Sequence, residues 1–278
     1  MRNLVQLSSM EEDIAATTSW QSSIFYFISS AYAVVSFVAL FQLVRIQLRV
    51  PEYGWTTQKI FHLMNFILNG VRALVFGLHT LLFLFHPKVF VLVLLDLPGL
   101  LFFSTYTLLV LFWAEIYHQA RSLPTDMLKI IYISINAALY IIQICIWIYL
   151  WTDDNSVVEF FGKIFIGGVS FVAALGFLLY GGRLFCMLRH FPIESKGRRK
   201  KLHEVGSITA ICFTCFLIRC VMGFLSAFDS DTSLDVLDHP ILDLVYYMLV
   251  EVLPSALVLY ILRKLPPRRI SAQYHAIH

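Results

Sequence analysis

The sequence predicts an all-α fold of the polytopic membrane class: a seven-transmembrane helix bundle with a luminal N-terminus and a cytosolic C-terminus. Three observations predict it: seven long apolar runs, an apolar content of 59% with mean hydropathy +0.75, and an uneven distribution of basic residues. The runs are Ile24–Val44, Ile60–Phe85, Phe90–Trp113, Ile130–Trp151, Phe160–Leu184, Ser207–Phe228 and Leu242–Leu262. Each reaches the ~20 residues that a hydrocarbon core of about 30 Å requires. The runs are apolar nearly all round, whereas a surface helix of a soluble protein keeps one polar face.

Basic residues predict the orientation, because short loops rich in lysine and arginine stay on the cytosolic side. One face holds 16 of the 21 lysines and arginines, in the connections after the first, third and fifth runs and in the tail. The opposite face has three, Arg2, Lys88 and Lys163, and the remaining two, Arg72 and Arg219, lie inside runs. Acidic residues between the runs gather on the basic-poor face. We therefore expect a luminal or extracellular N-terminus.

Three parts follow one another along the chain. A luminal N-terminal segment occupies residues 1–23, the seven-helix bundle residues 24–262, and a basic cytosolic tail residues 263–278. The first segment lacks the basic start, short apolar stretch and small-residue cleavage site of a signal peptide, so the first run should itself direct insertion. The connections between runs are too short for a soluble catalytic domain, and we expect no enzyme activity.

The second run carries a polar face. Asn65, Asn69 and Arg72 recur at helical spacing and continue to Phe76 and His79, so these side chains point the same way. A lipid-facing helix would not place two amides, a guanidinium and an imidazole on one side. We expect this face to turn toward the inside of the bundle.

The third, sixth and seventh runs also contain charges. Asp96 lies six residues from the luminal end of the third run, whereas Arg219 and Glu251 lie near the middle of the sixth and seventh. Pro98 and Pro254 follow the two acids closely and free backbone carbonyls beside them. We expect both prolines to kink their helices and to line a cavity.

These intramembrane charges should face one another, because each costs about 2.5–3.5 kcal/mol at the centre of a lipid-exposed helix. We expect Arg72 to reach Asp96 or Glu251, and Arg219 to take the other acid. The expected intramembrane polar core comprises Asn65, Asn69, Arg72, Asp96, Arg219 and Glu251. Three interpretations stay open: a structural cluster that fixes helix packing, a ligand-binding or state-switching core, and an ion or proton path.

Metal and cofactor chemistry finds little support in the sequence. Cys212 and Cys215 have the spacing of a redox or metal pair, but they lie in an apolar run without matching ligands and are interpreted as small packing residues. The histidines show no ligand spacing. We expect no metal, no cofactor and no catalytic residues. Small residues crowd the fifth run from Gly167 to Gly176 and would permit close helix contact within or between chains.

The connection after the fifth run has the densest charge. Five of its basic residues fall within six positions: Lys196, Arg198, Arg199, Lys200 and Lys201. The simplest interpretation is topology retention together with attraction to anionic lipid headgroups, at about 1 kcal/mol per basic residue near the surface. A specific protein or RNA–protein partner is the alternative, and the two interpretations are compatible.

Six stretches identify a resemblance that covers the chain from about Trp20 to the tail. They are Pro51–Asn65 (PEYGWTTQKIFHLMN), Leu97–Ser104 (LPGLLFFS), Trp113–Arg121 (WAEIYHQAR), Pro192–His203 (PIESKGRRKKLH), Asp235–Pro240 (DVLDHP) and Leu253–Tyr260 (LPSALVLY). The sequence closely resembles the tobamovirus multiplication protein family of plants.

The resemblance implies a seven-span protein of the vacuolar membrane, or tonoplast, that associates with itself, as a dimer, and with viral proteins. Such a host factor binds tobamovirus replication proteins and tethers the viral RNA replication complex to the membrane, without contacting nucleic acid directly. It thereby supports efficient viral multiplication as a scaffold rather than an enzyme.

A receptor-like protein that senses a ligand through the polar core is the alternative function. The third run ends without an acidic-Arg-Tyr triplet, and Tyr260 lies six residues beyond Pro254, so two receptor signatures are missing. A transporter would show related halves with broken helices, and the sequence has no clear internal repeat.

Overall fold

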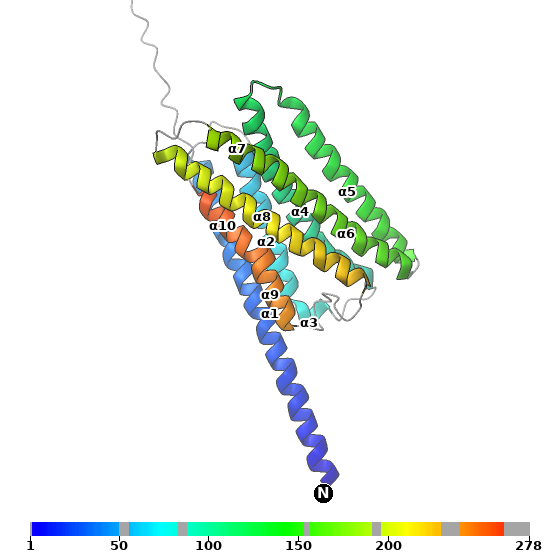
Figure 1. Ribbon diagram of the computed structural model, residues 1–278. Coiled ribbons are helices and arrows are strands. Elements are labelled where there is room, and N and C mark those ends of the chain that lie inside the picture. Colours follow the sequence, from blue (N-terminus) through cyan, green and yellow to red (C-terminus); the bar gives the residue numbers. More distant parts are fainter. Residues whose placement is uncertain are drawn as a thin grey trace, which may run out of the picture.

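The computed structural model describes residues 2–49, 56–82, 88–152, 156–190, 196–228 and 240–263, and all regular structure in these ranges is helical (Figure 1). The elements are α1 (Arg2–Arg49), α2 (Thr57–Gly77), α3 (His79–Leu82), α4 (Lys88–Ala120), α5 (Asp126–Thr152), α6 (Ser156–Gly176), the π-helical turn η1 (Phe177–Gly181), α7 (Gly182–His190), α8 (Lys196–Phe228), α9 (Pro240–Tyr247), the π-helical turn η3 (Met248–Val252) and α10 (Leu253–Leu262). Seven stretches within them are long and apolar enough to cross a membrane, which confirms the predicted fold class.

Two of the seven spans contain a π-helical turn that the sequence analysis did not predict. The fifth span joins α6, η1 and α7, and the seventh joins α9, η3 and α10. In the seventh, the backbone N–H of Leu253 donates to the carbonyl of Met248, five residues earlier. Pro254 has no N–H to donate to the preceding turn, so the regular α-helical pattern cannot continue through this point.

The second span is shorter than the run that predicted it. α2 ends at Gly77, the N–H of Leu78 closes the last turn onto the carbonyl of Leu74 at 2.9 Å, and α3 follows as one short turn. A Cβ at Gly77 would lie 3.0 Å from Oγ of Ser29, so α1 and α2 approach closely where the helix ends. Residues 83–85 of the expected run lie outside the described residues.

Packing places α4 at the centre and α5 at the edge of the bundle. α4 contacts α2, α5, α6, η1 and α7, whereas α5 contacts α4 and α6 and lies along one side in Figure 1. The core contains stacked and edge-on aromatic rings of α4, η1 and α8, among them Phe102, Phe177 and Phe216. α1 runs along the opposite side, and its N-terminal part extends beyond the other helices.

Small residues of the fifth span allow α6 and α8 of the same chain to pack closely. A Cβ at Gly223 of α8 would lie 3.1 Å from the Cα of Gly167 in α6, and the ring of Phe224 lies about as close to Gly167. The expectation of close contact through the small residues of this span therefore applies to the pairing of α6 with α8.

One end of the bundle collects the basic connections, and we call it the basic end. It holds the C-termini of α1, α4, α7 and α10 and the N-termini of α2, α5 and α8 (Figure 1). The side chain of Gln58 ties α2 to α10 there, with Nε2 donating to the carbonyl of Leu262 at 3.0 Å. Which side of the membrane the basic end faces stays a prediction.

Candidate functional site

Two arginines share one glutamate inside the bundle, and we call Arg72, Arg219 and Glu251 the charged triad. Arg72 of α2 binds the carboxylate through two atoms, with Nε donating to Oε2 at 2.8 Å and Nη2 to Oε1 at 2.7 Å. Arg219 of α8 donates from Nη1 to the same Oε1 at 2.6 Å. All three side chains are buried. The planar guanidinium matches a carboxylate with two parallel hydrogen bonds, which makes the Arg72 contact both strong and directional.

Aromatic side chains complete the environment of the triad. Tyr32 of α1 donates its hydroxyl to Oε2 of Glu251 at 2.7 Å. The guanidinium carbon of Arg72 lies 4.9 Å from the ring centre of Tyr247, and that of Arg219 lies 5.2 Å from Phe102. Both distances fall within the range of cation–π attraction. Three helices, α1, α2 and α8, thus supply donors to one carboxylate, which η3 carries.

Tyr32 is the functional candidate that the sequence analysis missed. It is fully buried in the first apolar run, where a phenol hydroxyl needs a hydrogen-bond partner. A tyrosine in the middle of such a run is therefore a usable signal, but the partner depends on which helix lies opposite.

The expected pairing of Asp96 is wrong. We predicted that Arg72 and Arg219 would each pair with a different acid, but both arginines bind Glu251. Oδ2 of Asp96 instead accepts hydrogen bonds from α5, from Nε2 of Gln143 at 3.2 Å and from Nε1 of Trp147 at 3.1 Å. The reason is that one carboxylate has enough lone pairs for several donors, while Asp96 lies within reach of two neutral donors of α5.

The two amides of the expected polar core are buried but bond to their own helix. Nδ2 of Asn65 donates to the carbonyl of Phe61 at 2.9 Å, and Nδ2 of Asn69 donates to the carbonyl of Asn65 at 2.7 Å. Both Oδ1 atoms are buried without a hydrogen-bond partner among the described residues. The predicted polar face of α2 is therefore present, but it is not a continuous hydrogen-bonded chain to the triad.

Pro98 and Pro254 differ in their local structure. α4 continues through Pro98 as one helix from Lys88 to Ala120, and the neighbouring Asp96 and Gly99 line a cavity. Pro254 lies in the first turn of α10, directly after the π-helical turn that contains Glu251. A kink at either proline stays a prediction.

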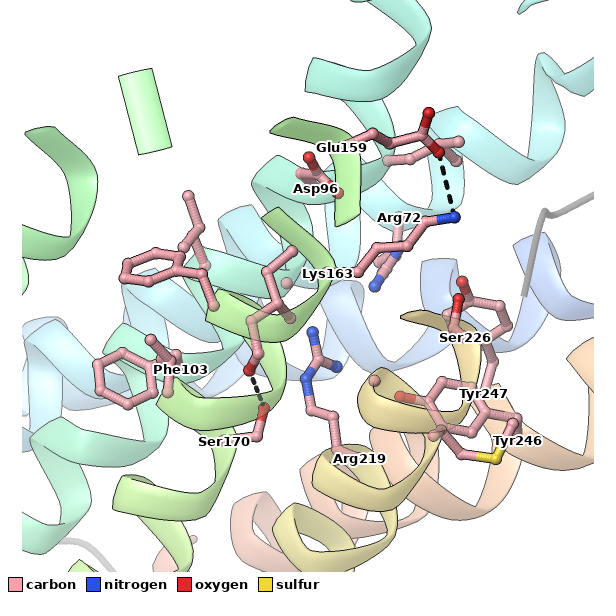
Figure 2. A pocket seen from close by; sticks show the side chains of 18 residues that line it. Arg72, Asp96, Phe103, Glu159, Lys163, Ser170, Arg219, Ser226, Tyr246 and Tyr247 are labelled. Atoms are coloured by element: carbon pink, nitrogen blue, oxygen red, sulfur yellow. Dashed lines mark hydrogen bonds and ion pairs between the residues drawn. The ribbon is translucent and has the colours of Figure 1, made fainter. Parts of the chain in front are cut away.

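A cavity of about 180 Å³ lies beside the charged triad (Figure 2). Arg72, Arg219 and Asp96 contribute to its polar wall, and Phe103 and Val169 to its apolar wall. Figure 2 shows the guanidinium of Arg219 projecting into it between α6 and the α9 tyrosines, Tyr246 and Tyr247. The site therefore combines fixed positive groups with a partly open cavity.

Comparison with known proteins identifies the family. The family model described as the THH1/TOM1/TOM3 domain matches residues 6–278. This chain belongs to that family. It is 76% identical to tobamovirus multiplication protein 1 of Nicotiana tabacum over 266 residues, which is 96% of this chain and 92% of the relative. It is 73% identical to the protein of that name from Arabidopsis thaliana, over 98% of this chain and 93% of the relative.

A second branch of the family is more distant. Tobamovirus multiplication protein 3 of Arabidopsis thaliana is 58% identical over 277 residues, which is 100% of this chain and 91% of the relative. No solved structure matches this chain. The resemblance expected from the sequence is thus confirmed at the level of the family.

The basic cluster lies at the N-terminus of α8. Residues 196–201 form the first turns of that helix at the basic end. The side chains of Lys196, Arg198, Arg199, Lys200 and Lys201 lie outside the described residues, as does the tail from residue 264. Their role in partner or lipid contact stays a prediction.

In the remaining described residues, the cysteines fit the packing interpretation. Cys212 is buried, and Sγ of Cys215 lies 3.7 Å from the carbonyl of Leu249 as a weak donor. No group of three or more metal-ligating side chains occurs within the part of the chain that the structure describes.

Proposed function

We propose that this protein is a membrane-anchored host factor that binds tobamovirus replication proteins and tethers the viral RNA replication complex to the membrane. The observation that carries the proposal is the 76% identity, over 96% of the chain, to a relative named tobamovirus multiplication protein 1. Identity at this level over nearly the full length supports a common role. We place the chain in the vacuolar membrane with its basic end in the cytosol.

The architecture supports an anchor. Seven spans hold the chain in the bilayer, and short connections at residues 50–56, 121–125 and 191–195 link them at the basic end. Anchoring restricts a bound partner to the membrane surface, so its effective concentration rises without strong individual contacts. The scaffold therefore needs only a modest binding surface.

The basic end is the proposed partner surface. It carries the N-terminal turns of α8, residues 196–201, together with basic residues of the neighbouring helix ends such as Arg49, Arg121 and Arg189. Positive charge there attracts acidic protein surfaces and anionic lipid headgroups alike. Contact between charged surfaces weakens with salt, since the Debye length is only about 10 Å at 0.1 M.

Co-purification tests the proposal. The full chain, solubilised in dodecylmaltoside, is mixed with a purified tobamovirus replication protein at physiological salt, with an unrelated seven-span protein as control. We expect specific retention that falls as salt rises. Absence of retention by a monodisperse, folded chain contradicts the proposal.

Neutralising the basic cluster of α8 locates the contact. We expect retention of the replication protein to fall severalfold when five basic residues are replaced by glutamine: Lys196, Arg198, Arg199, Lys200 and Lys201. The matched control is Lys163→Gln at the opposite end, where Nζ pairs with Oε1 of Glu159 at 3.1 Å, and it should leave retention unchanged. Unchanged retention in the cluster variant would move the contact to another connection at the basic end.

A second candidate function is favoured by the cavity beside the triad. A receptor-like protein needs a ligand site within its helix bundle, and Arg72, Arg219 and Asp96 line a cavity there. Retention of a replication protein together with ligand binding at this cavity would join the two functions in one molecule.

A further inference from the structure

Arg219 keeps unused donors in the cavity. A guanidinium has five N–H groups, and among the described residues Arg219 makes one hydrogen bond, from Nη1 to Glu251. Its side chain is 9% exposed, and that exposed part faces the cavity it lines. A Cβ at Gly99 of α4 would lie 2.5 Å from Nη2 of Arg219, so only a glycine at this position makes room for the guanidinium.

Arg72 adds a second positive charge beside the same cavity. Its side chain is 3% exposed, and Nη1 is buried without a hydrogen-bond partner in the described part of the chain. Because Nη1 has almost no accessible surface, Arg72 contributes charge to this wall and no free donor.

The charges of the triad do not balance among themselves. Two guanidiniums share the single carboxylate of Glu251, which leaves one positive charge. Asp96 lines the same cavity, but its Oδ2 is taken by the Gln143 and Trp147 donors of α5. Asp96 and Glu159 place carboxylates on the cavity wall, but among the described residues neither accepts a hydrogen bond from the remaining N–H groups of Arg219.

The rest of the cavity wall is apolar and favours a ligand with an apolar part. Leu100, Phe103, Val169 and Met222 line the cavity from α4, α6 and α8. A cavity of ~150 Å³ in a protein core holds a benzene ring, and this cavity is of comparable size at about 180 Å³. A ring or short chain with one acidic group fits both the volume and the lining.

We propose that this cavity binds a small organic monocarboxylate, whose carboxylate accepts hydrogen bonds from Arg219 beside the positive charge of Arg72 and whose apolar part packs against Phe103 and Val169. Guanidinium groups recognise carboxylates through paired, charge-assisted hydrogen bonds. The cavity reaches the end of the bundle opposite the basic end, because its lining includes Glu159 and Lys163, whose side chains are 45% and 33% exposed. The ligand enters there, past this ion pair (Figure 2).

Benzoate and benzamide provide a matched pair of probes, since they have nearly the same size and differ in charge. Melting temperature is measured for the full chain in dodecylmaltoside as each probe is titrated at fixed sodium chloride. We expect benzoate to raise it with the logarithm of its concentration, by about 2–4 °C at fivefold excess over the dissociation constant, and benzamide to leave it unchanged. An equal shift with benzamide, or with sodium chloride of the same ionic strength, overturns the proposal, as does no shift with benzoate, hexanoate and acetate.

Variants assign the effect to the site. Arg219→Gln removes the free guanidinium donors and leaves the Arg72–Glu251 pair, so benzoate should bind at least about tenfold more weakly. Gly168→Ala is the control, because an added Cβ meets nothing within 4 Å, and its benzoate shift should match the wild type.

A second variant keeps the test decisive if Arg219→Gln does not fold. Val169→Phe places a ring in the cavity and leaves the triad unchanged, so the benzoate shift should disappear. Retention of the full shift in Val169→Phe or in a folded Arg219→Gln shows that benzoate binds elsewhere and overturns the proposal. The inference bears on the receptor-like function and is independent of tethering, because failure of ligand binding leaves the co-purification result unchanged.

Discussion

α2 and α5 are both apolar enough to span a membrane, yet the bundle uses them in opposite ways. In their most apolar stretches 44% of α2 is buried, against 11% of α5. α2 turns Asn65, Asn69 and Arg72 inward, whereas the only buried side chains recorded for α5 are Asn136 and Gln143. Isoleucines of α5 such as Ile133 and Ile141 stay more than 60% exposed.

The difference shows which residues indicate the inward-facing side of a transmembrane helix. Lipid tails are as apolar as leucine, so an isoleucine gains little by turning inward. A polar side chain loses much by facing lipid and therefore marks the inner face, even on a peripheral helix. On α5, Asn136 Oδ1 accepts from Ser104 Oγ at 2.7 Å and Gln143 donates to Asp96, so both contact α4. Five predictions test this contrast, from the largest expected effect to the smallest.

Exchanging the charges of Arg219 and Glu251 should have the largest effect. With an isolated ion pair the double change Arg219→Glu and Glu251→Arg would restore stability. In the triad it places a second guanidinium where Arg72 binds, since Nη2 of Arg72 lies 2.7 Å from Glu251 Oε1. We expect the double variant to lose about 5 kcal/mol of stability, so that size exclusion recovers little monodisperse protein. Recovery to wild-type yield would mean that Arg72 is not part of the triad.

Glu251→Gln removes the shared carboxylate while keeping its shape. Two buried guanidiniums lose their counter-charge, and breaking a buried ion pair costs about 3–5 kcal/mol. The free energy of unfolding in detergent measures the loss. Ile133→Ala on α5 is the contrasting control, and its 63% exposed side chain should contribute less than about 1 kcal/mol. Similar losses in both variants would remove the distinction between core and periphery.

Tyr32→Phe deletes one hydroxyl donor to the triad. A hydrogen bond to a charged group contributes about 1.5–3 kcal/mol, so the melting temperature should fall clearly. Tyr149→Phe on α5 removes a hydroxyl from a side chain that is 45% exposed, and its effect should stay within about 0.5 kcal/mol. Equal melting temperatures for Tyr32→Phe and Tyr149→Phe would contradict the contrast between the buried core and α5.

Gln143→Leu tests the polar contact of α5 itself. It deletes a donor 3.2 Å from Asp96 Oδ2, while Trp147 Nε1 still donates to the same oxygen. We expect a loss of about 1 kcal/mol, near the net value of an ordinary hydrogen bond. Ile142→Leu on the neighbouring position conserves volume and serves as the reference in the same thermal unfolding assay. A larger loss for the isoleucine variant would place the inner face of α5 elsewhere.

The lipid face of α5 should give the smallest effect. Replacing Ile133, Ile141 and Ile148 together by leucine keeps the surface apolar, and we expect a change within about 0.5 kcal/mol. Cross-linking in membranes measures self-association in parallel. A loss above about 1 kcal/mol accompanied by fewer cross-linked dimers would show that a second copy, rather than lipid, covers this helix.

Part of the candidate site could be read from the sequence. Charges in apolar runs are costly wherever they lie, so Arg72, Arg219 and Glu251 were predicted to meet inside the bundle. Asp96 shows the limit, because its position along α4 was clear and its partners were not. Tyr32, which donates to Glu251, carries no charge and was overlooked.

The amino-acid sequence was enough to predict the seven helical spans and charged side chains buried among them, and its six characteristic stretches were enough to predict the family. The spans and the buried charges follow from local properties, since the cost of placing a side chain in lipid depends on that side chain and its depth. The packing of the helices was needed to show that both arginines share Glu251, that Asp96 bonds to α5, and that a cavity remains beside Arg219. Those features depend on which helices are neighbours and how closely they pack, and several packings satisfy the same hydrophobic pattern.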